Sequence, residues 1–106
     1  MNAYYHMRRY QRQAAMTATP EQLIAKLYDI GIQACHRQDL HKARAAVSEL
    51  MSSLNMEAGG ELAQRLYALY EFCLLDLAEG RTQHTREILE GLRAAWREGV
   101  LKQKAA

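Results

Sequence analysis

The sequence predicts an all-α protein, folded as an antiparallel up-down four-helix bundle. Apolar residues recur every three or four positions from Pro20 onward, which is the spacing of amphipathic helices. The chain has one proline and no alternating β-branched runs, so β-strands are not expected. The breaks between the periodic segments are short, and short connections join antiparallel neighbours. At 106 residues the chain is expected to form a single domain.

Three segments are expected along the chain. Residues 1–16 form an N-terminal arm or cap, residues 17–101 form the helical bundle, and residues 102–106 form a frayed tail. The net charge is only +2, but the arm carries three arginines and no acidic residue. After Pro20 there are 11 Lys and Arg residues against 12 Asp and Glu residues, so the body is nearly neutral.

The arm interleaves tyrosines with arginines, which suits single-stranded nucleic acid or an acidic membrane surface. The body offers no matching basic patch, so neither a nucleic-acid partner nor stable membrane insertion is expected. Two alternatives stay open. The arm is either mobile or docks on an apolar groove of the bundle through residues near helical spacing, namely Tyr4, Met7, Tyr10 and Ala14.

The first helix is expected to begin at Pro20 and to end near Arg37. Thr19 can cap it, Pro20 suits the first helical position, and Gln22 can complete a capping box. Two apolar rows run along this helix. The first contains Leu23, Leu27, Ile30 and Ala34, and the second contains Ile24, Tyr28, Gly31 and Cys35.

Asp39 can cap the second helix, which has one apolar row from Leu40 to Leu54. A break at 55–60 precedes the third helix, and Gly80 suits its C-terminal cap. The last helix is expected from about Thr82 to Val100. The third helix again has two rows, one with Leu62, Leu66, Leu69 and Cys73 and one with Ala63, Tyr67, Tyr70, Leu74 and Leu77.

The sequence carries no signature of an enzyme or of a metal site, so no catalysis and no cofactor are expected. Di-metal sites in helical bundles need a Glu-x-x-His spacing, and no Asp or Glu here has a His three residues later. Cys35 and His36 are sequence neighbours, which do not face each other on a helix. Cys35 and Cys73 are expected to be buried thiols in a reducing compartment. No secretory signal and no apolar run long enough to span a membrane are present, so a cytoplasmic location is expected.

The paired apolar rows on the first and third helices leave two interpretations open. A helix in a four-helix bundle needs roughly one apolar stripe to reach the core. The second row either fills an enclosed core or leaves a groove that another chain or the arm covers.

Three segments resemble the flagellar secretion chaperone FliS family and occur in the same order along the chain as in that family. They are AAMTATPEQLIAKLYD, SELMSSLNMEAGGELAQRLYALYEF and LRAAW. The resemblance covers most of the chain. It implies a cytoplasmic helical bundle that binds the disordered C-terminal region of flagellin, prevents premature polymerisation and aids delivery to the flagellar type III export gate. It also implies that the N-terminal arm occupies a groove until the client displaces it.

The resemblance implies partner-binding residues on three segments. They are Tyr5, Tyr10 and Met16 of the arm and its junction, Leu23, Leu27 and Tyr28 of the first helix, and Leu66, Tyr67 and Tyr70 of the third helix.

This chain departs from the family pattern in two ways. Ile30 stands between Leu-Tyr-Asp and Gly31, and the segment around the second helix is several turns shorter than usual. A shortened member of the family with part of its groove missing is therefore expected. The alternative function is a self-associating structural or adaptor bundle, forming a homodimer without binding flagellin.

Overall fold

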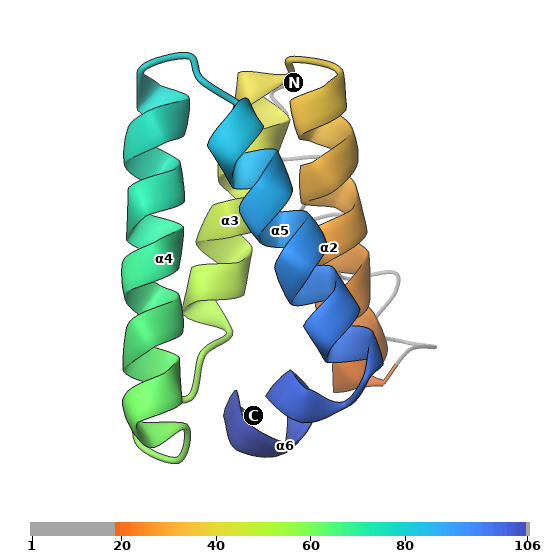
Figure 1. Ribbon diagram of the computed structural model, residues 1–106, viewed down its shortest axis with the longest axis vertical. Coiled ribbons are helices and arrows are strands. Elements are labelled where there is room, and N and C mark those ends of the chain that lie inside the picture. Colours follow the sequence, from red (N-terminus) through yellow and green to blue (C-terminus); the bar gives the residue numbers. More distant parts are fainter. Residues whose placement is uncertain (1–18, 106) are drawn as a thin grey trace.

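The structure, a computed structural model, is all-helical over the residues that it describes, 19–105 (Figure 1). These residues form α2 (Pro20–His36), α3 (Leu40–Ser52), α4 (Gly60–Ala78), α5 (Gln83–Arg97) and the short helix α6 (Val100–Ala105). The predicted fold class is confirmed for this part of the chain. Residues 1–18 lie outside the description, and so do the expectations for the arm and for Tyr5, Tyr10 and Met16.

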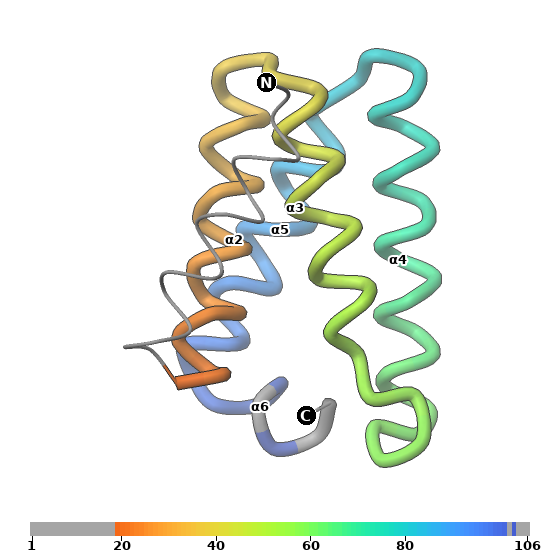
Figure 2. Tube along the Cα trace, turned by 180° about the vertical axis from the view of Figure 1, so that it is seen from behind, coloured from red at the N-terminus to blue at the C-terminus, as the bar shows by residue number. Residues whose placement is uncertain are grey.

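The helices pack as sequential antiparallel neighbours. Helix α2 packs against α3 and α5, and α3 also packs against α4. In Figure 1, α4 and α2 form opposite sides of the bundle, with α3 behind and α5 in front. The view from behind places α3 between α2 and α4 (Figure 2). Helix α5 begins next to the end of α4 and crosses toward the start of α2, so α4 and α5 diverge along their length (Figure 1).

The predicted N-terminal caps of the first two bundle helices are confirmed. The Thr19 hydroxyl accepts a hydrogen bond from the Gln22 N–H at 3.2 Å, and the Gln22 side-chain oxygen accepts from the Thr19 N–H at 3.0 Å. Together these bonds form the capping box at the start of α2. Asp39 Oδ1 accepts from the Lys42 N–H at 3.1 Å at the start of α3. Each cap satisfies backbone donors that a helix start otherwise leaves unpaired.

Helix α4 ends in a Schellman motif at Gly80, as the sequence predicts. Gly80 has a φ of 81° and donates to the Leu77 carbonyl, while the Arg81 N–H donates to the Asp76 carbonyl at 3.0 Å. Helix α2 ends in the same motif, but Gln38 takes the left-handed position with a φ of 57°. Nothing in the sequence indicated a left-handed residue there, because glycine is the usual occupant.

Small residues bring α2, α3 and α5 close together in the core. Gly31 lies opposite Leu89 of α5, and a Cβ atom at Gly31 would lie only 2.7 Å from Leu89 Cδ1 and 3.4 Å from Ala46 Cβ. Leu89 and Ala46 are both fully buried. A larger residue at position 31 would therefore force the packed side chain of Leu89 to shift, and glycine avoids that clash.

The buried face of α4 lies between its two predicted apolar rows. Leu66, Tyr70, Cys73 and Leu77 are buried, whereas Leu69 and Tyr67 on either side are 38% and 40% exposed. Helix α2 behaves in the same way, because its buried residues come from both rows and Leu23 and Ile24 stay half-buried. In both helices, the residues of the two rows that face the other helices therefore fill the core. The remaining residues of the two rows lie at or near the surface.

The expected extent of the last helix is wrong. It was expected to reach Val100, but α5 ends at Arg97 and the chain turns at Gly99, which has a φ of 87°. Helix α6 then continues through the expected boundary at residue 101 as far as Ala105. Glycine reverses the chain here because it adopts positive φ without the steric penalty of a Cβ atom.

Candidate peptide-binding groove

An apolar groove runs between the start of α2 and the end of α3, and we refer to it as the α2–α3 groove. Its volume is about 350 Å³. The α2 side contributes Leu23, Ile24 and Leu27, and α5 contributes Trp96. The remaining lining residues are Pro20 and Glu21 of α2, Glu49 and Ser52 of α3, and Ser53 directly after α3.

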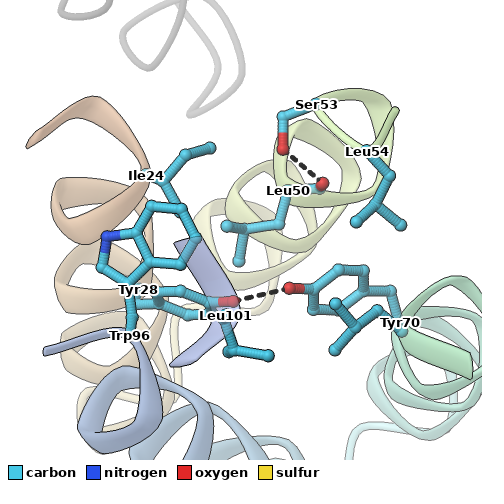
Figure 3. Close-up of a pocket in the computed structure, with 9 residues that line it drawn as sticks. Ile24, Tyr28, Leu50, Ser53, Leu54, Tyr70, Trp96 and Leu101 are labelled. Carbon is cyan, nitrogen blue, oxygen red and sulfur yellow. Dashed lines mark hydrogen bonds between the residues drawn. The ribbon is translucent and has the colours of Figure 1, made fainter. Parts of the chain in front are cut away.

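A smaller apolar cavity of about 50 Å³ lies deeper, and we refer to it as the inner pocket (Figure 3). Ile24, Ser53 and Trp96 line both the inner pocket and the α2–α3 groove, so the two spaces adjoin. The other lining residues come from four elements and one connection, namely Tyr28, Leu50, Leu54, Leu66, Tyr70 and Leu101.

A hydrogen bond between two tyrosines crosses the inner pocket. The hydroxyl oxygens of Tyr28 and Tyr70 lie 2.8 Å apart, as the dashed line in Figure 3 shows. Both side chains are buried, with 2% and 1% exposure. Burial raises the pKa of each phenol above its ordinary value, because the charged form loses its hydration. The pair is therefore neutral, and it satisfies two polar groups inside an apolar site.

Trp96 is held in place by α2. Its Nε1–H donates to the Glu21 carbonyl at 3.0 Å, and its ring lies 6.3 Å from that of Tyr28 in a tilted arrangement. The bond uses a carbonyl that the first turn of α2 presents toward α5. Trp96 thereby joins the last long helix to the wall of the α2–α3 groove.

A second apolar surface lies on the outside of α4, which we refer to as the α4 outer face. Phe72 and Leu75 are 45% and 69% exposed there. Tyr67 and Leu69 flank them at 40% and 38% exposure. Large apolar side chains gathered on one exposed helix commonly mark an interaction surface.

The structure distributes the predicted site residues over three places instead of one surface. Leu23 and Leu27 line the α2–α3 groove. Tyr28, Leu66 and Tyr70 line the inner pocket and belong to the buried core. Tyr67 is exposed on α4 and lines neither space. Tyr5, Tyr10 and Met16 lie outside the described residues.

Several lining residues were not among the predicted site residues. Trp96 and Ile24 line both spaces, and Leu54 and Leu101 line the inner pocket. Trp96 had a signal in the sequence, because the LRAAW segment was one of the three that carried the family resemblance. Leu101 had none, because the sequence did not predict the turn that brings it back to the bundle.

At the end of the bundle opposite the α2–α3 groove, a buried carboxylate of α4 binds side chains of the α4–α5 connection and of α5. Asp76 is 5% exposed, and its two oxygens lie 2.9 Å from Arg81 Nε and 2.9 Å from His84 Nδ1. A carboxylate only accepts hydrogen bonds, so Nδ1 of His84 carries the hydrogen. The bonds from His84 and Arg81 hold the pKa of Asp76 below its usual value. This cluster orders the turn and lies away from both apolar spaces.

Both cysteines are free and buried, as predicted. Burial raises the pKa of the Cys35 thiol to about 11, and burial also raises that of Cys73. Both thiols are therefore protonated near neutral pH. Within residues 19–105, no group of three or more His, Cys, Asp and Glu side chains is arranged to hold a metal ion.

Among the described helices, none has the length and apolar content needed to cross a membrane.

Comparison with known proteins identifies the family. The family model described as "Flagellar protein FliS" matches residues 34–104. The chain is 32% identical to the flagellar secretion chaperone FliS of Campylobacter jejuni subsp. jejuni serotype O:6 (strain 81116 / NCTC 11828) over 110 aligned positions, covering 84% of this chain and 86% of the relative. No solved structure matches the chain.

The alignment is longer than this 106-residue chain although it covers only part of it, so it contains gaps in this chain, as expected for a shortened member. The family model matches two thirds of the chain, and the relative is 32% identical over 84% of it. The chain therefore belongs to the FliS family of flagellar proteins.

Proposed function

We propose that this protein is a cytoplasmic export chaperone that binds the disordered C-terminal region of flagellin. By covering that region it prevents premature polymerisation, and it aids delivery of flagellin to the flagellar type III export apparatus. Family membership and the flagellar secretion chaperone among the relatives support the role. The observation that carries the binding mode is the open, apolar α2–α3 groove.

The energetics of binding require more apolar surface than this groove alone supplies. A micromolar complex needs about −8 kcal/mol, ordering the client costs about 2–5 kcal/mol, and association itself costs several kcal/mol more. At about 25 cal/mol per Å², the total corresponds to roughly 600–1,000 Å² of buried apolar area. Residues 20–27 span about 11 Å of helix. A client is therefore expected to continue onto other apolar surfaces, and the α4 outer face is available for that.

The predicted site residues take different roles in this proposal. Leu23 and Leu27 contact the client in the α2–α3 groove, and Tyr67 contacts it on α4. Tyr28, Leu66 and Tyr70 shape the inner pocket from the core side. The arm residues Tyr5, Tyr10 and Met16 cover the groove until the client displaces them, which lowers the apparent affinity for the client by competition.

Calorimetry with a peptide of the flagellin C-terminal segment tests the proposal. Leu23→Glu is the informative variant, because Leu23 lines the groove and is half-buried, so the bundle can fold without it. Gln33→Glu is the matched control, since it places the same charge at an exposed site of α2 away from the groove. We expect one-to-one binding by the wild type, with a negative heat-capacity change from apolar burial.

Leu23→Glu is expected to weaken binding at least about tenfold, because a buried leucine contributes about 1.5–3 kcal/mol and each 1.4 kcal/mol is tenfold. Gln33→Glu should bind as the wild type does. Equal binding by both variants would place the client elsewhere. Absence of binding by folded wild-type protein would overturn the flagellin assignment.

The exposed residues of the α4 outer face favour a second candidate function, self-association through that face. Phe72 and Leu75 would then lie in a homodimer interface. Light scattering over a range of protein concentrations tests it: Leu75→Glu should abolish a dimer that the wild type forms. A wild type that remains monomeric at all concentrations would remove this candidate.

A further inference from the structure

The bundle is open on one side, and α6 fills that opening. Helices α4 and α5 are closest at their connected ends, where Thr85 lies against the Cys73 carbonyl. At the other end, α5 packs on α2 through Trp96 and leaves α4. Helix α6 turns back there and contacts both α4 and α5. It therefore occupies the space that the divergence of α4 and α5 creates.

One described side chain anchors α6. Leu101 is 5% exposed and lines the inner pocket beside Tyr28, Tyr70 and Trp96 (Figure 3). The preceding residue, Val100, is 45% exposed and lines no part of the pocket. Among the α6 side chains that the structure describes, Leu101 is therefore the one inserted between the apolar walls.

The rest of α6 gives it little independent stability. It has six residues, far below the 12–15 or so that make an isolated helix even marginal in water. It is joined to α5 through Gly99, a residue type that adopts both positive and negative φ at little cost. Short terminal elements with few buried contacts open at a small fraction of the global unfolding free energy. Release of α6 is accordingly far easier than unfolding of the bundle.

The inner pocket beside Leu101 has the apolar walls needed to accommodate an aliphatic side chain. About 50 Å³ is empty with Leu101 in place, and its withdrawal would enlarge the pocket by the volume of that side chain. The walls are apolar, and the two tyrosine hydroxyls at the pocket satisfy each other. An aliphatic side chain can enter without leaving a polar group unpaired. Leu101 on α6 is itself an example of the chemistry that fits, a leucine presented by a short helix.

We propose that α6 is a displaceable plug, and that the inner pocket takes one aliphatic side chain from a short helical segment of the client in its place. This inference rests on the proposed function, because the client is the flagellin C-terminal segment. The plug keeps the apolar pocket closed in the free protein and competes with the client for it. A competitor attached to the same chain lowers apparent affinity by the fraction of molecules in which the pocket is open.

Hydrogen exchange read by mass spectrometry on the full chain tests the displacement directly. The backbone amides of residues 100–105 should exchange faster when the flagellin peptide is bound, because α6 has left the bundle. The core helices should exchange more slowly, because binding stabilises them. Unchanged or slower exchange in residues 100–105, with the peptide bound, would overturn the plug while leaving the proposed function standing.

Two single substitutions provide the second measurement. Leu101→Ser removes the anchor and should tighten peptide binding about three- to tenfold. Val100→Ser is the matched control on the same helix and should leave affinity unchanged. Circular dichroism checks that both variants fold, and if Leu101→Ser does not, the wild-type exchange result decides. Weaker binding by a folded Leu101→Ser would overturn the plug.

In this comparison the wild type is expected to bind as well, more weakly than Leu101→Ser. Failure of both proteins to bind the peptide would overturn the proposed function and the plug together.

Discussion

The hydroxyl pair of Tyr28 and Tyr70 is a test of whether these tyrosines act in the core or at the client surface. Their oxygens are 2.8 Å apart, both side chains are almost fully buried, and no described buried side-chain nitrogen or oxygen lacks a partner. Tyr70→Phe removes one hydroxyl and leaves the other buried without its partner. A buried polar group left unpaired costs about 1–3 kcal/mol. Tyr28→Phe should destabilise the protein by a similar amount for the same reason.

The double variant should be more stable than the sum of the single effects predicts. With both hydroxyls gone, no polar group remains unpaired, and replacing both partners of a buried bond is often nearly neutral. We expect the double variant to lie within about 1 kcal/mol of the wild type. The interaction energy in the mutant cycle, which is the excess of the two single effects over the effect of the double variant, is therefore about 1–6 kcal/mol in favour of the pair.

Urea unfolding followed by helical circular dichroism measures all four proteins, since a chain of this size is expected to unfold in two states. Additive effects of the two substitutions would refute the bond between the hydroxyls. The same proteins should be titrated with the flagellin peptide. If the tyrosines only shape the pocket, the double variant should bind nearly as the wild type does.

Three further predictions follow from packing and protonation. Gly31→Ala should be about 1–3 kcal/mol less stable than Gly91→Ala in thermal unfolding, because a methyl group at 31 meets packed side chains while Gly91 has open space around it; equal stabilities would contradict the close packing. Asp76 has a lowered pKa, so its contribution to stability is fully present above about pH 4, the pKa of an unfolded aspartate, and is lost as the pH falls through the folded value. The free energy of unfolding of Asp76→Asn, measured by urea unfolding at several pH values, should therefore fall less steeply at acid pH than that of the wild type. An equally steep fall would refute the role of Asp76 in stability. Cys35 and Cys73 should react with a thiol reagent at pH 8 only as the protein opens, because both are buried and protonated; rapid labelling of the native protein would show a looser core.

The local features of the fold follow from the sequence because they depend on neighbours a few residues apart. Thr19 and Asp39 cap helices through bonds that span three residues, and Gly80 ends a helix because its own backbone adopts positive φ. Apolar spacing predicted the bundle for the same reason, since a helix repeats every 3.6 residues regardless of its partners. The last helix was an exception, because Gly99 did not stand out as a break within an otherwise helical pattern.

The division of residues between core and surface required the tertiary structure. Tyr67 and Tyr70 occupy the same apolar row in the sequence, yet one is exposed and the other buried, because α3, α5 and α6 cover only the sector of α4 between its two rows. The position of the α2–α3 groove and the burial of Leu101 likewise depend on how the helices pack, and the sequence did not indicate them.

The sequence by itself determined the four long helices, the caps at Thr19, Asp39 and Gly80, the antiparallel order and the family resemblance. Only the tertiary structure decided which apolar side chains remain at the surface and that α6 closes the end of the bundle. Periodicity specifies the direction in which a side chain leaves its own helix, whereas burial depends on the angles and distances at which other helices approach, and those are set by packing between residues far apart in the chain.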